Sequence, residues 1–169
     1  LSSEELQQQV DYWKQLLQGN LPILQMPVDH ARLAIAKNKG AEIHFQIEEP
    51  LFHSLQTLAR SKDVSIFMLL MSSYLCLLYK YTGQTDLIVG APMADRTRPG
   101  TENLIGFFVN ALVLRFNISP EQSFTDLLEQ VKEVCLSGFS HQDVPFETLV
   151  EQLHPDRDLS RAPLFQTSV

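Results

Sequence analysis

Hydrophobic residues recur every three or four positions along much of the chain, the spacing typical of helices with one apolar face. This spacing predicts helices that begin at Ser2, Pro50, Ile66, Ser123 and Asp143. Serine and aspartate at such starts can accept hydrogen bonds from the unpaired amides of the first helical turn. The stretch from Ile66 to Tyr81 is apolar nearly all round, so we expect this helix at the centre of the core.

A second pattern, of short apolar or alternating runs, predicts strands. In "AEIHFQI" apolar and polar residues alternate, which indicates a strand with one buried face, whereas the continuous run "DLIVGAPMA" indicates a strand covered on both faces. Together with two further runs, these predict four strands, at residues 41–47, 86–94, 104–118 and 163–169. Helices that alternate with strands favour the α/β class, here a mixed sheet covered by helices.

Three residues within these elements have a specific expected role. Gly106 is expected to mark a bulge or a close backbone approach in the long strand. Asp143 is suited to cap the last helix, and Pro145 to lie in its first turn. Both ends of the pattern are interrupted, so we expect the chain to be part of something larger.

Composition and charge narrow the possible partners. The chain has 169 residues, of which 44% are hydrophobic and 20% charged, as expected for one compact unit. Its net charge is -7 and it has no run of Lys and Arg, so nucleic acid is not an expected partner. The longest apolar stretch, residues 66–79, is interrupted by serines and is too short for a bilayer, so no membrane partner is expected.

The cysteines and histidines do not form a recognisable site. Cys76 and Cys135 lie in apolar helical patterns without the spacing of a metal or redox motif, which indicates free thiols in a reducing, cytoplasmic setting. The five histidines are scattered along the sequence, so we expect no metal site.

Two candidate sites of chemistry each have a plain alternative. His141 lies two residues from Asp143, which could orient it as a general base, but the same residues also suit a loop that leads into a helix. Arg157 and Arg161 could bind a phosphate, or they could pair with neighbouring aspartates such as Asp158. The residues alone therefore assign no catalytic group.

Four stretches together resemble the later core motifs of nonribosomal peptide synthetase condensation domains, in that family's order and spacing. They are "DLIVGAPMADR" (86–96), "IGFFVNALVLR" (105–115), "HQDVPFE" (141–147) and "RDLSRAPL" (157–164). The family fold is similar to chloramphenicol acetyltransferase, with two lobes and a catalytic histidine in an HHxxxDG motif of the first lobe. This chain has no HHxxxDG, so residues 1–169 resemble the C-terminal half alone.

The resemblance implies a function for this half. Condensation domains form amide bonds between an acyl or peptidyl thioester and an aminoacyl thioester, both carried on phosphopantetheine arms. These arms are substrates, and no cofactor bound directly to the chain is expected. The chain would be the acceptor-side half of the enzyme, and it would be inert alone because the catalytic histidine belongs to the other half.

The resemblance also implies roles for particular residues. Gly106, Phe108 and Asn110 would line the substrate tunnel, although a strand bulge with a satisfied amide is an equal alternative. Arg96 would pair with the motif aspartate of the other half, unless it is a solvated loop arginine. "HQDVPFE" would be a structural turn before a helix, so His141 would not be the base.

The expected partners are the N-terminal half, peptidyl carrier proteins and an adjacent adenylation domain. A different class of function remains open: a scaffold that docks a carrier protein and an adenylation domain. A third possibility is the matching half of an epimerisation or cyclisation domain.

Overall fold

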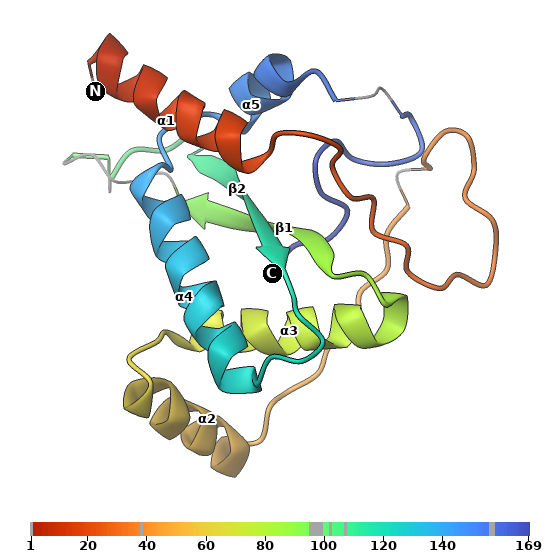
Figure 1. The fold of residues 1–169 in the computed structure, drawn as a ribbon, viewed down its shortest axis with the longest axis vertical. Coiled ribbons are helices and arrows are strands. Elements are labelled where there is room, and N and C mark those ends of the chain that lie inside the picture. Colours follow the sequence, from red (N-terminus) through yellow and green to blue (C-terminus); the bar gives the residue numbers. More distant parts are fainter. Residues whose placement is uncertain (1, 38, 95–99, 102, 107, 156–157) are drawn as a thin grey trace.

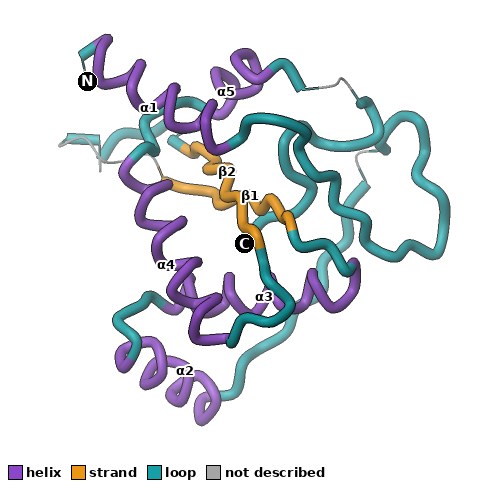
Figure 2. Tube along the Cα trace, in the orientation of Figure 1, coloured by secondary structure: helices purple, strands orange, loops and turns teal. Residues whose placement is uncertain are grey.

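The structure of the protein, a computed structural model, describes residues 2–37, 39–94, 100–101, 103–106, 108–155 and 158–169. The elements follow one another as α1 (Ser3–Leu16), α2 (Glu49–Ser61), α3 (Ile66–Thr82), β1 (Asp86–Ala94), β2 (Val109–Asn117), α4 (Phe124–Ser140) and α5 (Phe146–Leu153). Figures 1 and 2 show helices arranged around a small sheet, with long loops on one side of the molecule. The mixed α/β class is thus confirmed.

The predicted helices form, and local chemistry fixes their ends. Ser2 accepts a hydrogen bond from the backbone of Glu5, whose carboxylate accepts one from the backbone of Ser2 in return. Ser123 and Asp126 form the same capping box at the start of α4. Gly83 ends α3 in the left-handed conformation, with a φ of 68°, which glycine adopts without steric cost.

The sheet is smaller than the sequence predicted. β1 and β2 pair antiparallel, with Gly90 opposite Val113, and the end of the chain adds only one parallel bridge, between Gly90 and Ser168. Leu164 has a φ of 65°, which breaks the extended path of the predicted last strand. Within the described part of the chain, two predicted strands, 41–47 and 163–169, are therefore absent as such.

The predicted long strand over residues 104–118 was also wrong at its start. β2 begins at Val109, and Gly106 lies before it in an exposed bend rather than in a strand bulge. An added Cβ at Gly106 would lie 2.9 Å from Cε2 of Phe108, which is a side-chain contact and not the close backbone approach that was predicted. The bend turns the chain just before pairing begins, which shortens the strand.

The core lies between the sheet and the helices. α3 and α4 pack against each other, and α4 also packs against β2, whereas α1 lies beside α5 (Figure 1). Gly138 allows α4 to lie close to β2, since an added Cβ at Gly138 would lie 2.8 Å from Cδ2 of Leu114 in β2. The helix α3 lies in the core as predicted. The fully buried side chains include Trp13, Met71, Leu75, Val89, Leu114 and Phe116.

No single helix in the described residues is long and apolar enough to cross a membrane. α2 and α3 meet the criteria of length and composition only as a pair, and the two helices are bent by 103° relative to each other.

We expect Gly90→Ala to destabilise the folded protein by about 1–3 kcal/mol. The added Cβ would lie 2.4–2.7 Å from ring carbons of Phe165, and this half-buried ring would have to leave its packing against Phe146. Urea denaturation followed by circular dichroism measures the free energy of unfolding. Gly40→Ala is the control, because no atom lies within 4 Å of its added Cβ. Equal stability of the two variants would contradict the expectation.

Candidate functional site

The side-chain amide of Asn110 joins the start of β2 to the turn that precedes α5. Its Nδ2 donates to the carbonyl oxygens of Gln142 and Val144, both at 2.9 Å. Its Oδ1 accepts from the backbone amides of Ala111 at 2.9 Å and Phe146 at 3.0 Å. Two donors and two lone pairs are all that an amide offers, so this half-buried group is saturated.

Helix α1 holds the same turn from its other side. Nε2 of Gln9 donates to Oδ2 of Asp143 at 2.8 Å, and the Asp143 amide donates to Oε1 of Gln9 at 3.1 Å. The indole Nε1 of Trp13 donates to the carbonyl oxygen of His141 at 2.8 Å. We call residues 141–146, held by Asn110, Gln9 and Trp13, the clamped turn.

The predicted cap of α5 by Asp143 was wrong. The N-cap is Pro145, one residue before the helix instead of inside its first turn, and no side chain caps it. The Asp143 carboxylate is occupied by Gln9, while the first helical amide, that of Phe146, donates to Asn110. The side-chain oxygen of Asn110, which is distant in sequence, therefore accepts the hydrogen bond that the nearby Asp143 carboxylate was expected to accept.

His141 ends α4 and takes part in packing. Its ring stacks on Tyr12, with centroids 3.7 Å apart and planes at 8°, and its Nδ1 lies 2.7 Å from the carbonyl oxygen of Ser137. Burial raises the pKa of the Tyr12 phenol, so the tyrosine ring that stacks on His141 stays neutral at pH 7. Asp143 bonds to Gln9 and not to His141. This geometry favours the structural role of His141 over that of a general base.

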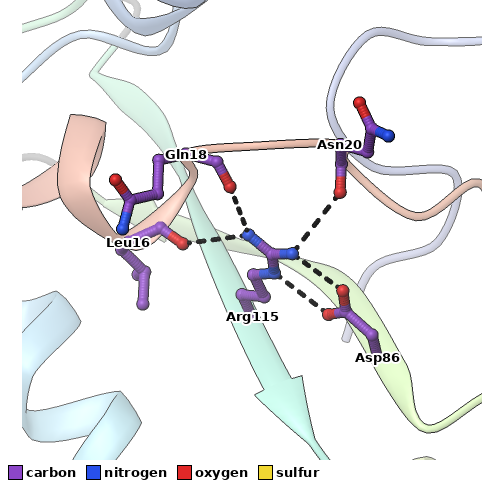
Figure 3. A network of polar contacts seen from close by, with 5 residues as sticks. All are labelled: Leu16, Gln18, Asn20, Asp86 and Arg115. Atoms are coloured by element: carbon purple, nitrogen blue, oxygen red, sulfur yellow. Dashed lines mark hydrogen bonds and ion pairs between the residues drawn. The ribbon is translucent and has the colours of Figure 1, made fainter.

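A guanidinium fixes the opposite end of β2 (Figure 3). Arg115 donates through Nε and one terminal nitrogen to both carboxylate oxygens of Asp86, at 3.0 and 2.8 Å. Its terminal nitrogens also donate to the carbonyl oxygens of Leu16, Gln18 and Asn20, at 3.3, 3.0 and 3.5 Å. The group therefore ties both strands to the end of α1, where helix carbonyls lack partners.

The electrostatics of this cluster agree with its geometry. The hydrogen bonds to Asp86 raise the pKa of Arg115, which remains charged at any physiological pH. The side chains of Arg115 and Asp86 are only 16% and 32% exposed, so water screens the pair incompletely.

The second candidate cluster contains Asp158 and Arg161. Oδ2 of Asp158 lies 2.5 Å from Nε of Arg161, and hydrogen bonds from Ser160 together with this cation lower the pKa of the Asp158 carboxyl. The ion-pair alternative for Arg161 therefore holds in the structure. Arg157, its predicted companion, lies outside the described residues, as does Arg96.

The three residues predicted to line a tunnel differ in their surroundings. Gly106 is exposed next to the half-buried Phe108, whereas Asn110 faces the clamped turn with its amide fully used. The satisfied-amide alternative therefore describes Asn110.

Metal and thiol chemistry have no visible site in the described part of the chain. No group of three or more His, Cys, Asp and Glu side chains there is placed to hold a metal ion. Both cysteines are free, and burial raises the pKa of the Cys135 thiol to about 11. A buried thiol of that pKa stays protonated at neutral pH and is a poor nucleophile.

Several residues of these clusters carried no signal in the sequence. Gln9 follows two other glutamines, and nothing local distinguishes it from them. Arg115 and Asp86 face each other only because antiparallel pairing sets Asp86 opposite Asn117, two residues beyond Arg115. Knowledge of the strand register would have found this pair, since diagonal neighbours of that kind are within reach of long side chains.

Residues 1–169 match the condensation domain family along the whole chain. The chain belongs to the condensation domain family. It is 42% identical over 165 residues to bacitracin synthase 1 of Bacillus licheniformis, and the aligned region covers 98% of this chain and 3% of that protein. A condensation domain segment of this kind is thus a small part of its curated relatives.

Two solved structures resemble this condensation domain segment. The crystal structure of holo-AB3403, a four-domain nonribosomal peptide synthetase bound to AMP and glycine, is 27% identical with a TM-score of 0.93, covering 99% of this chain and 13% of that one. The X-domain from teicoplanin biosynthesis in complex with OxyB is 26% identical with a TM-score of 0.90, covering 97% and 36%. The chain therefore spans about a third or less of these solved chains.

We expect Asn110→Asp to destabilise the condensation domain by about 2 kcal/mol. A carboxylate oxygen would replace Nδ2 and face the carbonyl oxygens of Gln142 and Val144, which then lack a donor. The midpoint and slope of urea denaturation measure the loss. Asn103→Asp makes the same charge change at an exposed turn and is the control. A loss of similar size in both variants would show that charge, not the clamped turn, is responsible.

We expect Arg115→Lys to cost about 1–2 kcal/mol, although the positive charge is kept. A single ammonium cannot bind both oxygens of Asp86 and also reach the carbonyls at the end of α1. Amide hydrogen exchange should become faster in residues 16–20, and urea denaturation should give the energy. Arg60→Lys, on the exposed surface of α2, is the control. Unchanged exchange in residues 16–20 would refute this role for Arg115.

Proposed function

We propose that the chain is the C-terminal, acceptor-side half of a condensation domain that forms amide bonds between carrier-bound thioesters. The observation that carries the proposal is the clamped turn: Asn110 of "IGFFVNALVLR" binds "HQDVPFE", so two motifs of the family form one structural unit. The full-length family match supports the same assignment.

The reaction needs little covalent help from the protein. The acceptor amine attacks the thioester carbonyl, a carbon–nitrogen bond forms, the carbon–sulfur bond breaks, and a proton leaves the amine. Catalysis then depends on alignment of the two arms and on removal of that proton. In this proposal the present half supplies a rigid wall, with Gly106 and Phe108 beside the arms, and the other half supplies the base.

His141 is not that base in the proposed mechanism. Its stack on Tyr12 and its contact with Ser137 leave it a packing role at the end of α4. The sequence has no HHxxxDG, so the proton acceptor is assigned to the N-terminal half. We assign Arg96, from its place in "GAPMADR", as the partner of that motif's aspartate.

The partners follow from this assignment. They are the N-terminal half, peptidyl carrier proteins that present the phosphopantetheine arms, and a neighbouring adenylation domain. The similarity to a four-domain synthetase bound to AMP and glycine supports this setting.

A second candidate function is a docking module without amide synthesis. One similar structure is an X-domain in complex with the protein OxyB, so this fold can act as a protein-binding surface. The two candidates differ in whether the parent protein makes an amide product.

In this proposal the chain is part of a longer synthetase, which we call the parent protein. We expect the parent protein, with both neighbouring carrier proteins loaded, to form an amide product that mass spectrometry detects on the acceptor carrier. Residues 1–169 alone should give none, because the base lies elsewhere. Amide formation by residues 1–169 alone would refute the proposal that the base lies in the other half. A parent that binds carriers and forms no product would favour the docking module, and inversion of a carrier-bound residue or ring closure would indicate epimerisation or cyclisation.

His141→Phe is the matched variant in the same assay. Phenylalanine keeps an aromatic ring against Tyr12 and removes the ring nitrogens, together with the contact between Nδ1 and the Ser137 carbonyl oxygen, so amide formation should stay within about threefold of the unmodified parent if His141 only packs. Loss of a general base costs about 10²–10⁴-fold. A drop of that size would make His141 the base. Replacement of the HHxxxDG histidine of the parent supplies the reference for such a loss.

A further inference from the structure

Gln9 is the one member of a run of three glutamines that points into the molecule. Gln7 and Gln8 are exposed, whereas Gln9 is only 9% exposed. Successive side chains of an α-helix point about 100° apart, so neighbours in such a run face different surroundings. A glutamine loses side-chain freedom and hydration when it is buried, so burial is favourable only where hydrogen-bond partners replace the water. For Gln9 that partner is Asp143.

The contact between Gln9 and Asp143 uses both ends of the glutamine amide. Nε2 of Gln9 donates to the Asp143 carboxylate, and Oε1 accepts from the Asp143 backbone amide. Trp13, four residues further along the same face of α1, donates to the carbonyl oxygen of His141. Two contacts about one helical turn apart fix both the rotation and the position of α1 against the clamped turn.

The clamped turn depends on side chains for its conformation. Among the described residues, no main-chain group bonds to the main chain of residues 142–144. The partners are side chains instead: Gln9 accepts from the amide of residue 143, and Asn110 donates to the carbonyl oxygens of residues 142 and 144. Loss of Gln9 therefore leaves the amide of residue 143 unpaired, and the turn has no main-chain bond there to hold its shape.

Asn110 extends this series of contacts to the expected tunnel wall. Its amide bonds to residues 142, 144 and 146 of the clamped turn. Phe108, assigned above to the wall beside the phosphopantetheine arms, lies two residues before Asn110 in the chain. A displacement of the clamped turn that Asn110 follows therefore reaches the backbone at Phe108.

We propose that Gln9 is a positioning residue for amide formation. Through Asp143 and the clamped turn it holds Asn110, and Asn110 holds the wall at Phe108 along which the two arms align. Gln9 touches no substrate and transfers no proton in this scheme, and the inference rests on the proposed function. A misplacement of about 1 Å, even from a change far from the chemistry, can lower the rate of a reaction about 10²-fold.

The Gln9–Asp143 pair can be broken and rebuilt by an exchange of donor and acceptor. Gln9→Glu removes the donor and sets a second carboxylate against that of Asp143. Asp143→Asn in the same protein supplies a new donor, the asparagine Nδ2, and restores both hydrogen bonds. Asp143→Asn alone still offers an oxygen to Nε2 of Gln9 and keeps the pair. Gln8→Glu makes the same chemical change at an exposed position and is the matched control.

The test measures amide formation by the parent protein with loaded carrier proteins, at a temperature where circular dichroism shows each variant to be folded. We expect Gln9→Glu to lower kcat about 10–100-fold and to leave the KM for the loaded acceptor carrier within about threefold, because it disturbs alignment and not carrier binding. Asp143→Asn, Gln8→Glu and the double variant Gln9→Glu with Asp143→Asn should each keep kcat within about threefold of the unmodified parent.

Two results of this assay would overturn the inference. An unchanged kcat in folded Gln9→Glu protein would make Gln9 a structural residue only, even if the free energy of unfolding were lower. A loss of kcat that Asp143→Asn does not restore would show that the pair is not its cause. Where Gln9→Glu does not fold, Gln9→Met takes its place, because methionine has a similar length and forms neither hydrogen bond, and an unchanged kcat there has the same consequence.

Amide hydrogen exchange gives a measurement that needs no substrate. Exchange within residues 108–112 and 142–146 should be at least about threefold faster in Gln9→Glu than in the unmodified parent, should return in the double variant, and should not change in α2. Faster exchange in residues 142–146 alone would overturn the inference, because the displacement would not reach the wall. An unmodified parent that forms no amide would overturn the proposed function instead, so the two failures are distinguishable.

Discussion

The structure depends on the requirement that a polar group removed from water must find all its partners. Asn110 meets this requirement with four hydrogen bonds, three of them to residues more than 30 positions away in the chain. Because its donors and acceptors are fixed in space, the amide accepts only one arrangement of β2, the clamped turn and the start of α5. Removal of water from this cluster is therefore favourable only when the three segments have come together.

Strand β2 connects the other elements of the segment, since a cluster of hydrogen-bonded polar groups lies near each of its ends. Asn110 attaches the first end to the turn before α5, and Arg115 attaches the other to β1 and to the end of α1. Between them, Leu112 and Leu114 are buried, close to Gly138 of α4. The apolar middle supplies most of the stabilisation, and the polar ends fix its register.

An apolar strand fixed at both ends by polar clusters suits the proposed role, in which the alignment of substrates matters more than reactive side chains. A wall that guides two tethered substrates needs rigid backbone more than it needs nucleophiles, and the described clusters consist of saturated amides, ion pairs and stacked rings. The most conspicuous histidine, His141, is used in the same way, as a ring that packs on Tyr12.

The sequence by itself determined the helices, because their signals are local. Capping residues such as Ser123 lie three positions from their partners, and an apolar stripe is visible within one window of sequence. The motif order also sufficed to indicate the family. The same local pattern gave Asp143 the wrong role, since its partner Gln9 lies 134 positions away.

Tertiary structure alone decided which strands exist and which side chains form the clusters. A strand needs a paired edge, so "AEIHFQI" has the alternation of a strand and yet is not one, because no residue in the described part of the chain pairs with its backbone. Likewise, Asn110, Gln9 and Arg115 acquire their roles from register and from close approach of distant segments, which periodicity does not encode. Local chemistry sets where a helix begins, whereas the satisfaction of buried polar groups is a property of the whole fold.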